Sequence, residues 1–110
     1  MGIRFYESGT DFALPGGWVL SDSMPDPVYF SDQGLPDLAL AETSAFGVSV
    51  FTNVQEGPHK VWYGAPQGYT CTSDYLPDDD DSVEVPVENG FVTMLGIACT
   101  PLDEQRSSDL

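Results

Sequence analysis

The segment TSAFGVSVFTNVQEGPHKVWYGAPQGYTC, residues 43–71, decides the fold class of this 110-residue chain. Two runs in it, Gly47–Asn53 and Pro58–Gly64, place apolar and polar side chains with a period of two residues. This period is typical of β-strands, because successive side chains point to opposite faces of a sheet. Gly47 and Gly57 stand at the turns, where reversal of the chain requires a positive φ that glycine adopts easily. The segment therefore predicts two strands, each preceded by a glycine turn.

The same pattern continues on both sides of this segment. Further short strands are predicted at Ile3–Glu7, Trp18–Ser21, Val28–Ser31, Leu38–Glu42, Ser82–Glu88 and Phe91–Thr100. Asn89-Gly90 predicts a hairpin turn between the last two of these. No segment supplies the helix expected of a parallel crossover. We therefore expect an all-β fold, a single antiparallel β-sandwich of about seven to eight short strands in residues 1–100, with a polar tail at 101–110.

The strands carry apolar side chains on both faces. The residues predicted to face the core are Phe51, Val54, Val61 and Tyr63. In the last strand Leu95, Ile97 and Cys99 share one face. Side chains on the other face are covered either by loops of this chain or by another subunit or domain, because a sheet face exposed to water is usually polar. The short loops favour an interface with another subunit or domain. These interface candidates are Val48, Val50 and Trp62.

The central segment also carries the motif of a known family. The matching positions are Thr43, Gly47, Phe51, Asn53, Val54, Gly57 and Val61. Over residues 26–100 the chain resembles carboxypeptidase regulatory-like domains, which are transthyretin-like (prealbumin-like) β-sandwiches related to the Cna B-type repeats of surface proteins. Ser49 and His59 depart from this pattern, since aromatic residues are common there. The resemblance implies a transthyretin-like sandwich in an extracellular or periplasmic module that extends, spaces or adheres, and it implies no particular ligand.

The charge of the chain limits its partners. There are 18 Asp and Glu residues against 3 Lys and Arg, which gives a net charge of −15. Such a surface repels phosphate backbones and anionic lipids, so we expect no nucleic-acid partner. No window reaches 18 apolar residues, so no membrane insertion is expected. The first 20 residues lack the pattern of a signal peptide, so a targeting segment of a secreted form is expected outside this numbering.

Two cysteines, Cys71 and Cys99, are present. In a small β domain such a pair is typical of one disulfide formed in an oxidising compartment, and the alternative is two buried thiols. Zinc binding is not expected, because the cysteines form no C-x-x-C pair and His59 is the single histidine. We therefore expect a Cys71–Cys99 disulfide and an extracellular or cell-surface location.

The residues that could carry chemistry do not form a recognisable catalytic motif. His59 would have to serve any Ser-His-Asp arrangement, yet no serine stands in a nucleophile elbow. We therefore expect no catalytic residues and no enzyme. The acidic run Asp78, Asp79, Asp80 and Asp81 could supply oxygen ligands to calcium, but its spacing matches no EF-hand, and a solvated loop is the alternative. Trp18, Trp62 and Tyr63 could form a platform for sugars, or they could belong to the core.

These features together predict a non-enzymatic extracellular structural or interaction domain. Its partner is expected to be protein, either a second copy or a neighbouring domain, as in a self-assembling subunit of a surface filament, pilus or other surface assembly. The alternative is an accessory domain of a larger secreted protein that binds calcium or carbohydrate. No cofactor is expected, and calcium at the acidic run is the one candidate.

Overall fold

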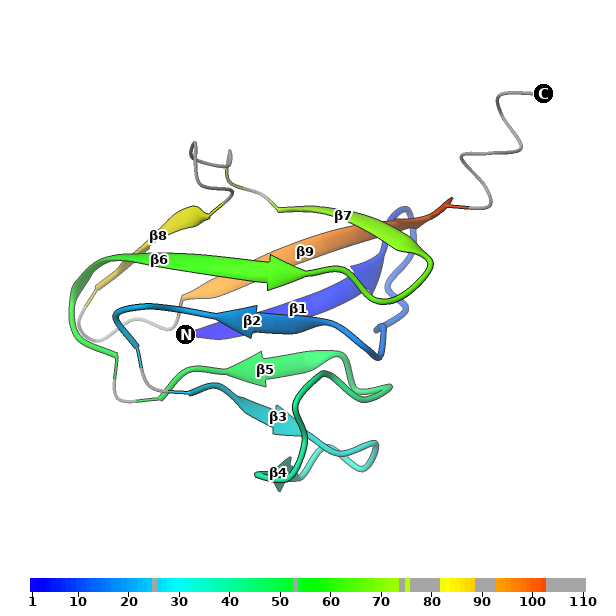
Figure 1. Ribbon diagram of the computed structural model, residues 1–110, viewed down its shortest axis with the longest axis horizontal. Helices are drawn as coiled ribbons and strands as arrows, with labels where there is room; N and C mark the ends of the chain where they lie inside the picture. The colour runs from blue at the N-terminus through cyan, green and yellow to red at the C-terminus, as the bar shows by residue number, and fades with distance from the viewer. Residues whose placement is uncertain (25, 53, 74, 76–81, 89–92, 103–110) are drawn as a thin grey trace.

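The computed structural model describes residues 1–24, 26–52, 54–73, 75, 82–88 and 93–102. The strands found there are β1 (Gly2–Glu7), β2 (Trp18–Leu20), β3 (Val28–Phe30), β4 (Pro36–Asp37), β5 (Val48–Val50), β6 (Gly57–Gly64), β7 (Tyr69–Ser73), β8 (Val83–Val87) and β9 (Met94–Pro101). They form a six-stranded sheet in the order β4-β3-β5-β1-β9-β7 and a three-stranded sheet in the order β2-β6-β8 (Figure 1). The predicted all-β sandwich is confirmed, with nine strands in the described residues rather than seven or eight.

The expectation of a wholly antiparallel sandwich is wrong for one pair of strands. β1 and β9 run parallel over six paired residues, from Gly2 opposite Met94 to Glu7 opposite Cys99. A parallel pair needs a long connection. Here almost the whole domain lies between the two strands, so no crossover helix is required.

The predicted strand Leu38–Glu42 is also wrong. The short strand β4 lies just before it, and the chain then turns. The Asp37 carboxylate accepts a hydrogen bond from the Ala39 N–H at 3.0 Å, and the Asp37 carbonyl accepts one from Leu40 N at 3.3 Å. An Asp side chain that bonds the backbone two residues on forms a turn in place of a strand ladder. Leu38 is consequently 87% exposed.

The predicted hairpin between the last two strands is not formed. β8 pairs with β6 in one sheet, whereas β9 pairs with β1 and β7 in the other. The Asn89-Gly90 turn itself lies outside the described residues. A strand was missed at Tyr69–Ser73, although Tyr69 and Cys71 alternate with Thr70 and Thr72 there and these residue types favour a strand. β9 continues through Pro101, one residue past the predicted end of the domain.

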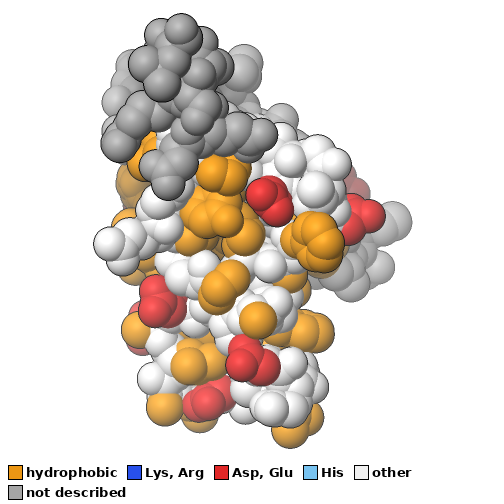
Figure 2. All heavy atoms as spheres, turned by 90° about the vertical axis from the view of Figure 1, so that its right-hand side faces the viewer, with side chains coloured by type: hydrophobic (Ala, Val, Ile, Leu, Met, Phe, Trp, Pro, Cys, Tyr) orange, Lys and Arg blue, Asp and Glu red, His pale blue; other side chains and the backbone are white. Residues whose placement is uncertain are grey.

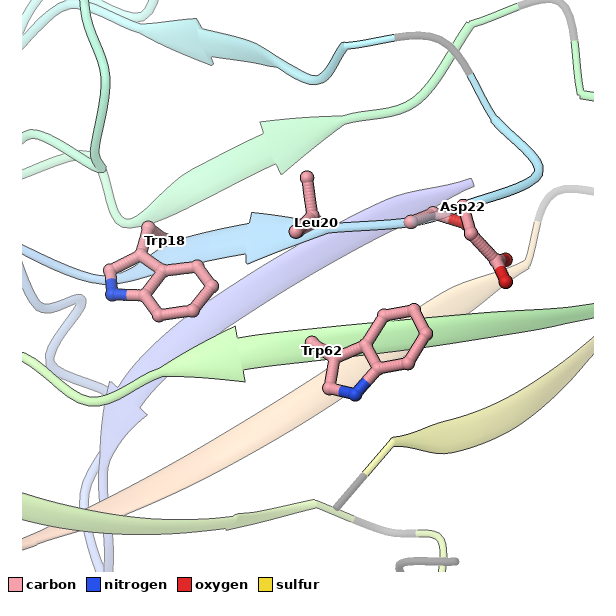
Figure 3. A pocket seen from close by; sticks show the side chains of 5 residues that line it. Trp18, Leu20, Asp22 and Trp62 are labelled. Atoms are coloured by element: carbon pink, nitrogen blue, oxygen red, sulfur yellow. The ribbon is translucent and has the colours of Figure 1, made fainter. Parts of the chain in front are cut away.

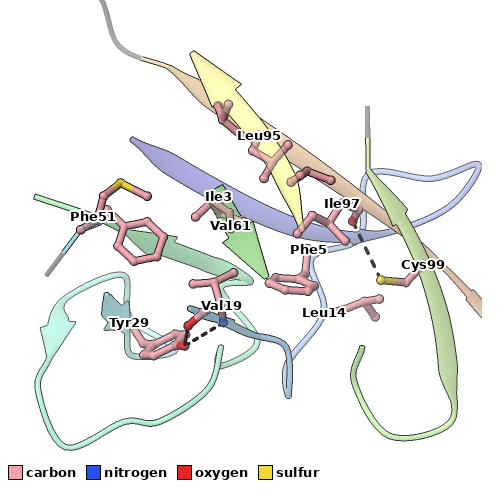
Figure 4. Close-up of a cluster of buried hydrophobic side chains, with 13 residues drawn as sticks. Ile3, Phe5, Leu14, Val19, Tyr29, Phe51, Val61, Leu95, Ile97 and Cys99 are labelled. Atoms are coloured by element: carbon pink, nitrogen blue, oxygen red, sulfur yellow. Dashed lines mark hydrogen bonds between the residues drawn. The ribbon is translucent and has the colours of Figure 1, made fainter. Parts of the chain in front are cut away.

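Side chains of both sheets meet in one core (Figure 4). Its most buried members are Ile3, Phe5, Phe51, Val61, Val83, Val85, Leu95, Ile97 and Cys99. The inward positions predicted for Phe51 and Val61 are confirmed, and Val54 and Tyr63 pack partly against the same cluster. The positive φ predicted for Gly47 and Gly57 is confirmed as well, at 74° and 129°.

A hydrogen bond inside the core links the two sheets. Tyr29 on β3 accepts a hydrogen bond at its phenol oxygen from the Val19 N–H on β2, at 3.1 Å (Figure 4). Burial raises the pKa of Tyr29 and the charge of Glu42 adds to this, while the bond to Val19 lowers the pKa. The phenol is therefore neutral at physiological pH and fixes β2 against the larger sheet.

Thr43 fastens two loops at one end of the sandwich. Its side chain, 3% exposed, donates to the Leu14 carbonyl and accepts from the Gly17 N–H, both at 2.9 Å. Its backbone N–H donates to the Gly17 carbonyl at 2.7 Å, and its carbonyl accepts from Gly16 N at 2.8 Å. Thr43, the first residue of the 43–71 segment, thus holds the loop that leads into β2.

Ser49 is the one described residue whose fully buried side-chain oxygen has no hydrogen-bond partner. It faces the core from β5, between Tyr29 and Ile3 in the register of the sheet. A buried hydroxyl without a partner costs free energy, so Ser49→Ala is expected to raise the free energy of unfolding by about 0.5–1 kcal/mol. Urea denaturation measures this. The control is Ser82→Ala, because Ser82 is equally buried but has an interaction partner. A loss of stability in Ser49→Ala would contradict the assignment.

The predicted disulfide is confirmed. Cys71 on β7 and Cys99 on β9 are directly opposite each other in the antiparallel register, and a bond joins their sulfur atoms. It ties the edge strand β7 to β9, its neighbour in the larger sheet. A disulfide is compatible with a domain formed in an oxidising compartment.

Candidate functional site

The outer face of the three-stranded sheet carries large apolar side chains. In β2, Val19 points into the core with 4% exposure, so the neighbouring Trp18 and Leu20 point outward and are 44% and 52% exposed. In β6 the buried positions are His59 and Val61, which turns Trp62 outward. The outward position predicted for Trp62 is confirmed. Trp18 and Leu20 are thus exposed on this face, and Trp62 lies half-buried beside them. An exposed apolar patch on a sheet face is typical of an interaction site.

These side chains line a shallow groove of about 460 Å³ (Figure 3). We call it the tryptophan groove, and its lining residues are Trp18, Leu20, Ser21, Asp22 and Trp62. Figure 3 shows Trp18 at one end and the Asp22 carboxylate at the other, with Leu20 and Trp62 between them. Its volume is in the range of ligand sites in proteins, and its walls combine apolar surface with a few polar groups.

A glycine explains how the Trp18 indole is placed. Trp18 lies opposite Gly64 in the register of β2 and β6. A Cβ atom added to Gly64 would overlap the indole nitrogen and the adjoining ring carbons of Trp18. The indole therefore rests against the bare backbone of β6, in the way that an aromatic side chain covers a glycine on the neighbouring strand. One side of the ring is covered, and the rest of it is open to solvent.

A chain of hydrogen bonds anchors the loop that carries Ser21 and Asp22. Ser23 Oγ lies 2.8 Å from His59 Nδ1, and His59 Nε2 lies 2.7 Å from the carbonyl oxygen of Gln55. A carbonyl oxygen can only accept, so Nε2 carries the proton and donates to it. In the neutral ring Nδ1 then accepts from the Ser23 hydroxyl. His59, buried on the inner side of β6, thus fixes the loop beside the outward-facing Trp62.

Sequence reasoning missed this pair, because the two residues are 36 positions apart. A serine hydroxyl bonded to an imidazole is also the first element of nucleophilic catalysis. Acyl transfer further needs N–H donors for the oxyanion. The backbone N–H of Ser23 is already directed to Ser21 Oγ at 3.3 Å. We therefore interpret the Ser23–His59 bond as one that positions the loop.

The other predicted site residues are not brought to the tryptophan groove. Val48 and Val50 are partly buried and point to the outer face of the six-stranded sheet, on the opposite side of the sandwich from Trp62. Tyr63 lies opposite Val19 and packs against the core, so it does not join Trp18 and Trp62 in an aromatic platform. The calcium candidates Asp78, Asp79, Asp80 and Asp81 lie outside the described residues. Within the described residues, no group of three or more His, Cys, Asp or Glu side chains could hold a metal ion.

A second hollow, of about 390 Å³, lies at the end of the sandwich where the loops gather. Its walls include Pro15, Glu42, Thr43, Pro66 and Tyr69. Figure 2 shows this end, with Asp and Glu side chains spread among hydrophobic ones. Thr43 is almost fully buried there, and its hydroxyl and backbone groups already hold the loop that leads into β2. The tryptophan groove is therefore the better candidate for a functional site.

Comparison of the chain with protein-family models, curated proteins and solved structures finds no match. The resemblance to carboxypeptidase regulatory-like domains consequently stays a prediction. In the part of the chain that the structure describes, no helix is long and apolar enough to cross a bilayer.

Proposed function

We propose that this chain is a non-enzymatic, extracellular interaction domain that binds its partner in the tryptophan groove. The observation that carries the proposal is the exposure of Trp18 beside Leu20 and Trp62 on an outer sheet face. Tryptophan is among the residues that contribute most to binding energy at interfaces, because a large rigid surface is desolvated at a small cost in conformational entropy. The Cys71–Cys99 disulfide supports the extracellular setting.

The partner is proposed to be a different molecule rather than a second copy. Self-assembly through all three predicted interface residues would have to join opposite faces head to tail, because Val48 and Val50 lie on one outer face and Trp62 on the other. Each copy carries a net charge of −15, and this charge opposes stacking at low ionic strength. The groove is accordingly assigned to a partner that does not share this charge.

Selection from a random peptide library against the wild-type chain, without counter-selection, tests the proposal. The selected peptides are then measured against the Trp18→Ala/Trp62→Ala double variant. Selected peptides are expected to lose about 30-fold or more in affinity on Trp62→Ala, because truncation of a central interface tryptophan costs about 2 kcal/mol. Gly64→Ala keeps both indoles but displaces the Trp18 ring, so it is expected to weaken the same peptides. Peptides that bind the double variant as tightly as the wild type would contradict the proposal.

A further inference from the structure

The electrostatic field around the tryptophan groove selects for one sign of charge. The chain has 18 acidic residues and 3 basic ones, so a cationic ligand is attracted from every direction and an anionic one is repelled. Acidic side chains are also seen on the loop end of the sandwich (Figure 2). Complementary charge raises the association rate and the specificity of a complex more than its affinity.

The local charges of the groove agree with the overall field. Asp22 is exposed at the end of the groove nearest Trp62 (Figure 3). One step further along the outer face of β6, Lys60 lies directly opposite Glu84 of β8. Because opposite charges in a cross-strand pair offset each other, the lysine does not cancel the charge of Asp22.

The two tryptophans lie close together on the outer face of the smaller sheet. Trp18 pairs with Gly64 and Trp62 pairs with Leu20, so the tryptophans are diagonal neighbours on adjacent strands, roughly 7–8 Å apart at their bases. Tryptophan is the side chain that attracts cations most strongly through its ring face. Arginine combines such stacking with a fork of N–H donors that fits a carboxylate, whereas lysine presents only a compact charge.

From these observations we infer that the tryptophan groove binds an arginine side chain within a basic peptide segment of the partner. The guanidinium stacks on an indole, and the Asp22 carboxylate accepts its N–H groups. The Ser23–His59 bond holds the loop so that Asp22 stays beside Trp62. This inference rests on the proposed function, since it names the ligand of the same groove.

The chain offers a built-in reporter for this site. Its two tryptophans both line the groove, so tryptophan emission reports the groove alone. We suggest titrating the full chain with hexa-arginine and with hexa-lysine, which carry equal charge, and measuring emission together with calorimetric affinity. Hexa-arginine is expected to change the emission and to bind about 3- to 10-fold more tightly than hexa-lysine, the size expected of stacking on indoles.

Single substitutions distinguish peptide binding in the tryptophan groove from nonspecific electrostatic attraction to an acidic protein. Trp18→Ala and Trp62→Ala are each expected to reduce the preference for arginine over lysine, and the remaining indole still reports binding. Asp22→Asn is expected to weaken hexa-arginine binding several-fold. Asp11→Asn is the matched control, because it removes the same charge from an exposed loop. The backbone carbonyl of Asp11 accepts a hydrogen bond from Arg4 on β1, which belongs to the six-stranded sheet and not to the sheet of the groove. Thermal unfolding confirms that each variant is folded.

Three outcomes would overturn the inference. Equal binding of the two peptides without a change in emission would show unspecific attraction. An equal effect of Asp22→Asn and Asp11→Asn would remove Asp22 from the site. If a neutral peptide or neutral oligosaccharide changes the emission and hexa-arginine does not, the groove remains a binding site and only its arginine ligand is wrong. If, in addition, the library-selected peptides bind the Trp18→Ala/Trp62→Ala variant as tightly as the wild type, the proposed function is wrong as well.

Discussion

Replacing Cys71 and Cys99 together with alanine is expected to lower the free energy of unfolding by about 3–4 kcal/mol. The bond joins residues 28 positions apart, and the closed loop restricts the unfolded chain. It also holds β7, an edge strand whose one neighbour in the sheet is β9. Small domains have a total stability of about 5–15 kcal/mol, so this loss is a large part of the whole.

Urea denaturation of the wild type and the double variant, with and without a reductant, measures the effect. The double variant avoids a single unpaired thiol that could form bonds between molecules. Reductant is expected to lower the stability of the wild type to that of the double variant and to leave the variant unchanged. A loss below about 1 kcal/mol would contradict the structural role of the bond.

Thr43→Val is expected to lower the free energy of unfolding by about 2–4 kcal/mol. Valine keeps the shape of threonine but removes the hydroxyl, which leaves the Gly17 N–H and the Leu14 carbonyl without partners in a buried place. Each unsatisfied buried group costs about 1–3 kcal/mol. The loop that leads into β2 is loosened by the same change, so the placement of Trp18 should suffer as well.

Thr43→Ser is the matched control, because it keeps the hydroxyl and removes one methyl group. Its expected cost is about 1 kcal/mol. Urea denaturation of the three proteins gives the comparison, and the emission of the groove tryptophans gives the effect on Trp18. Equal stabilities of the valine and serine variants would show that the hydroxyl does not matter.

The alternation of side chains was enough to predict much of the core and one part of the site. It placed Phe51 and Val61 inward and Trp62 outward, because local side-chain periodicity is preserved in any sheet. It could not show which sheet each strand joins. Val48, Val50 and Trp62 share an outward orientation, yet they lie on opposite sides of the sandwich.

The predictions of strands and turns were wrong where a local sequence pattern competed with another local pattern or with contacts between distant residues. Leu38 and Leu40 alternate like a strand, but the Asp37 side chain captures the Ala39 N–H and turns the chain. The Asn89-Gly90 signal predicts a hairpin, but β8 and β9 find partners in different sheets. The bond between Ser23 and His59 joins positions far apart in the sequence. No periodicity could have revealed it.

The most direct test of the tryptophan groove as the binding site is acrylamide quenching of the two indoles, in the free chain and with a saturating amount of a library-selected peptide. Both indoles line the groove and Trp18 is 44% exposed, so the free chain is expected to be quenched readily. Binding should cover the rings and reduce the quenching constant several-fold. If calorimetry shows that the peptide is bound while quenching stays unchanged, the partner binds elsewhere and the account is wrong.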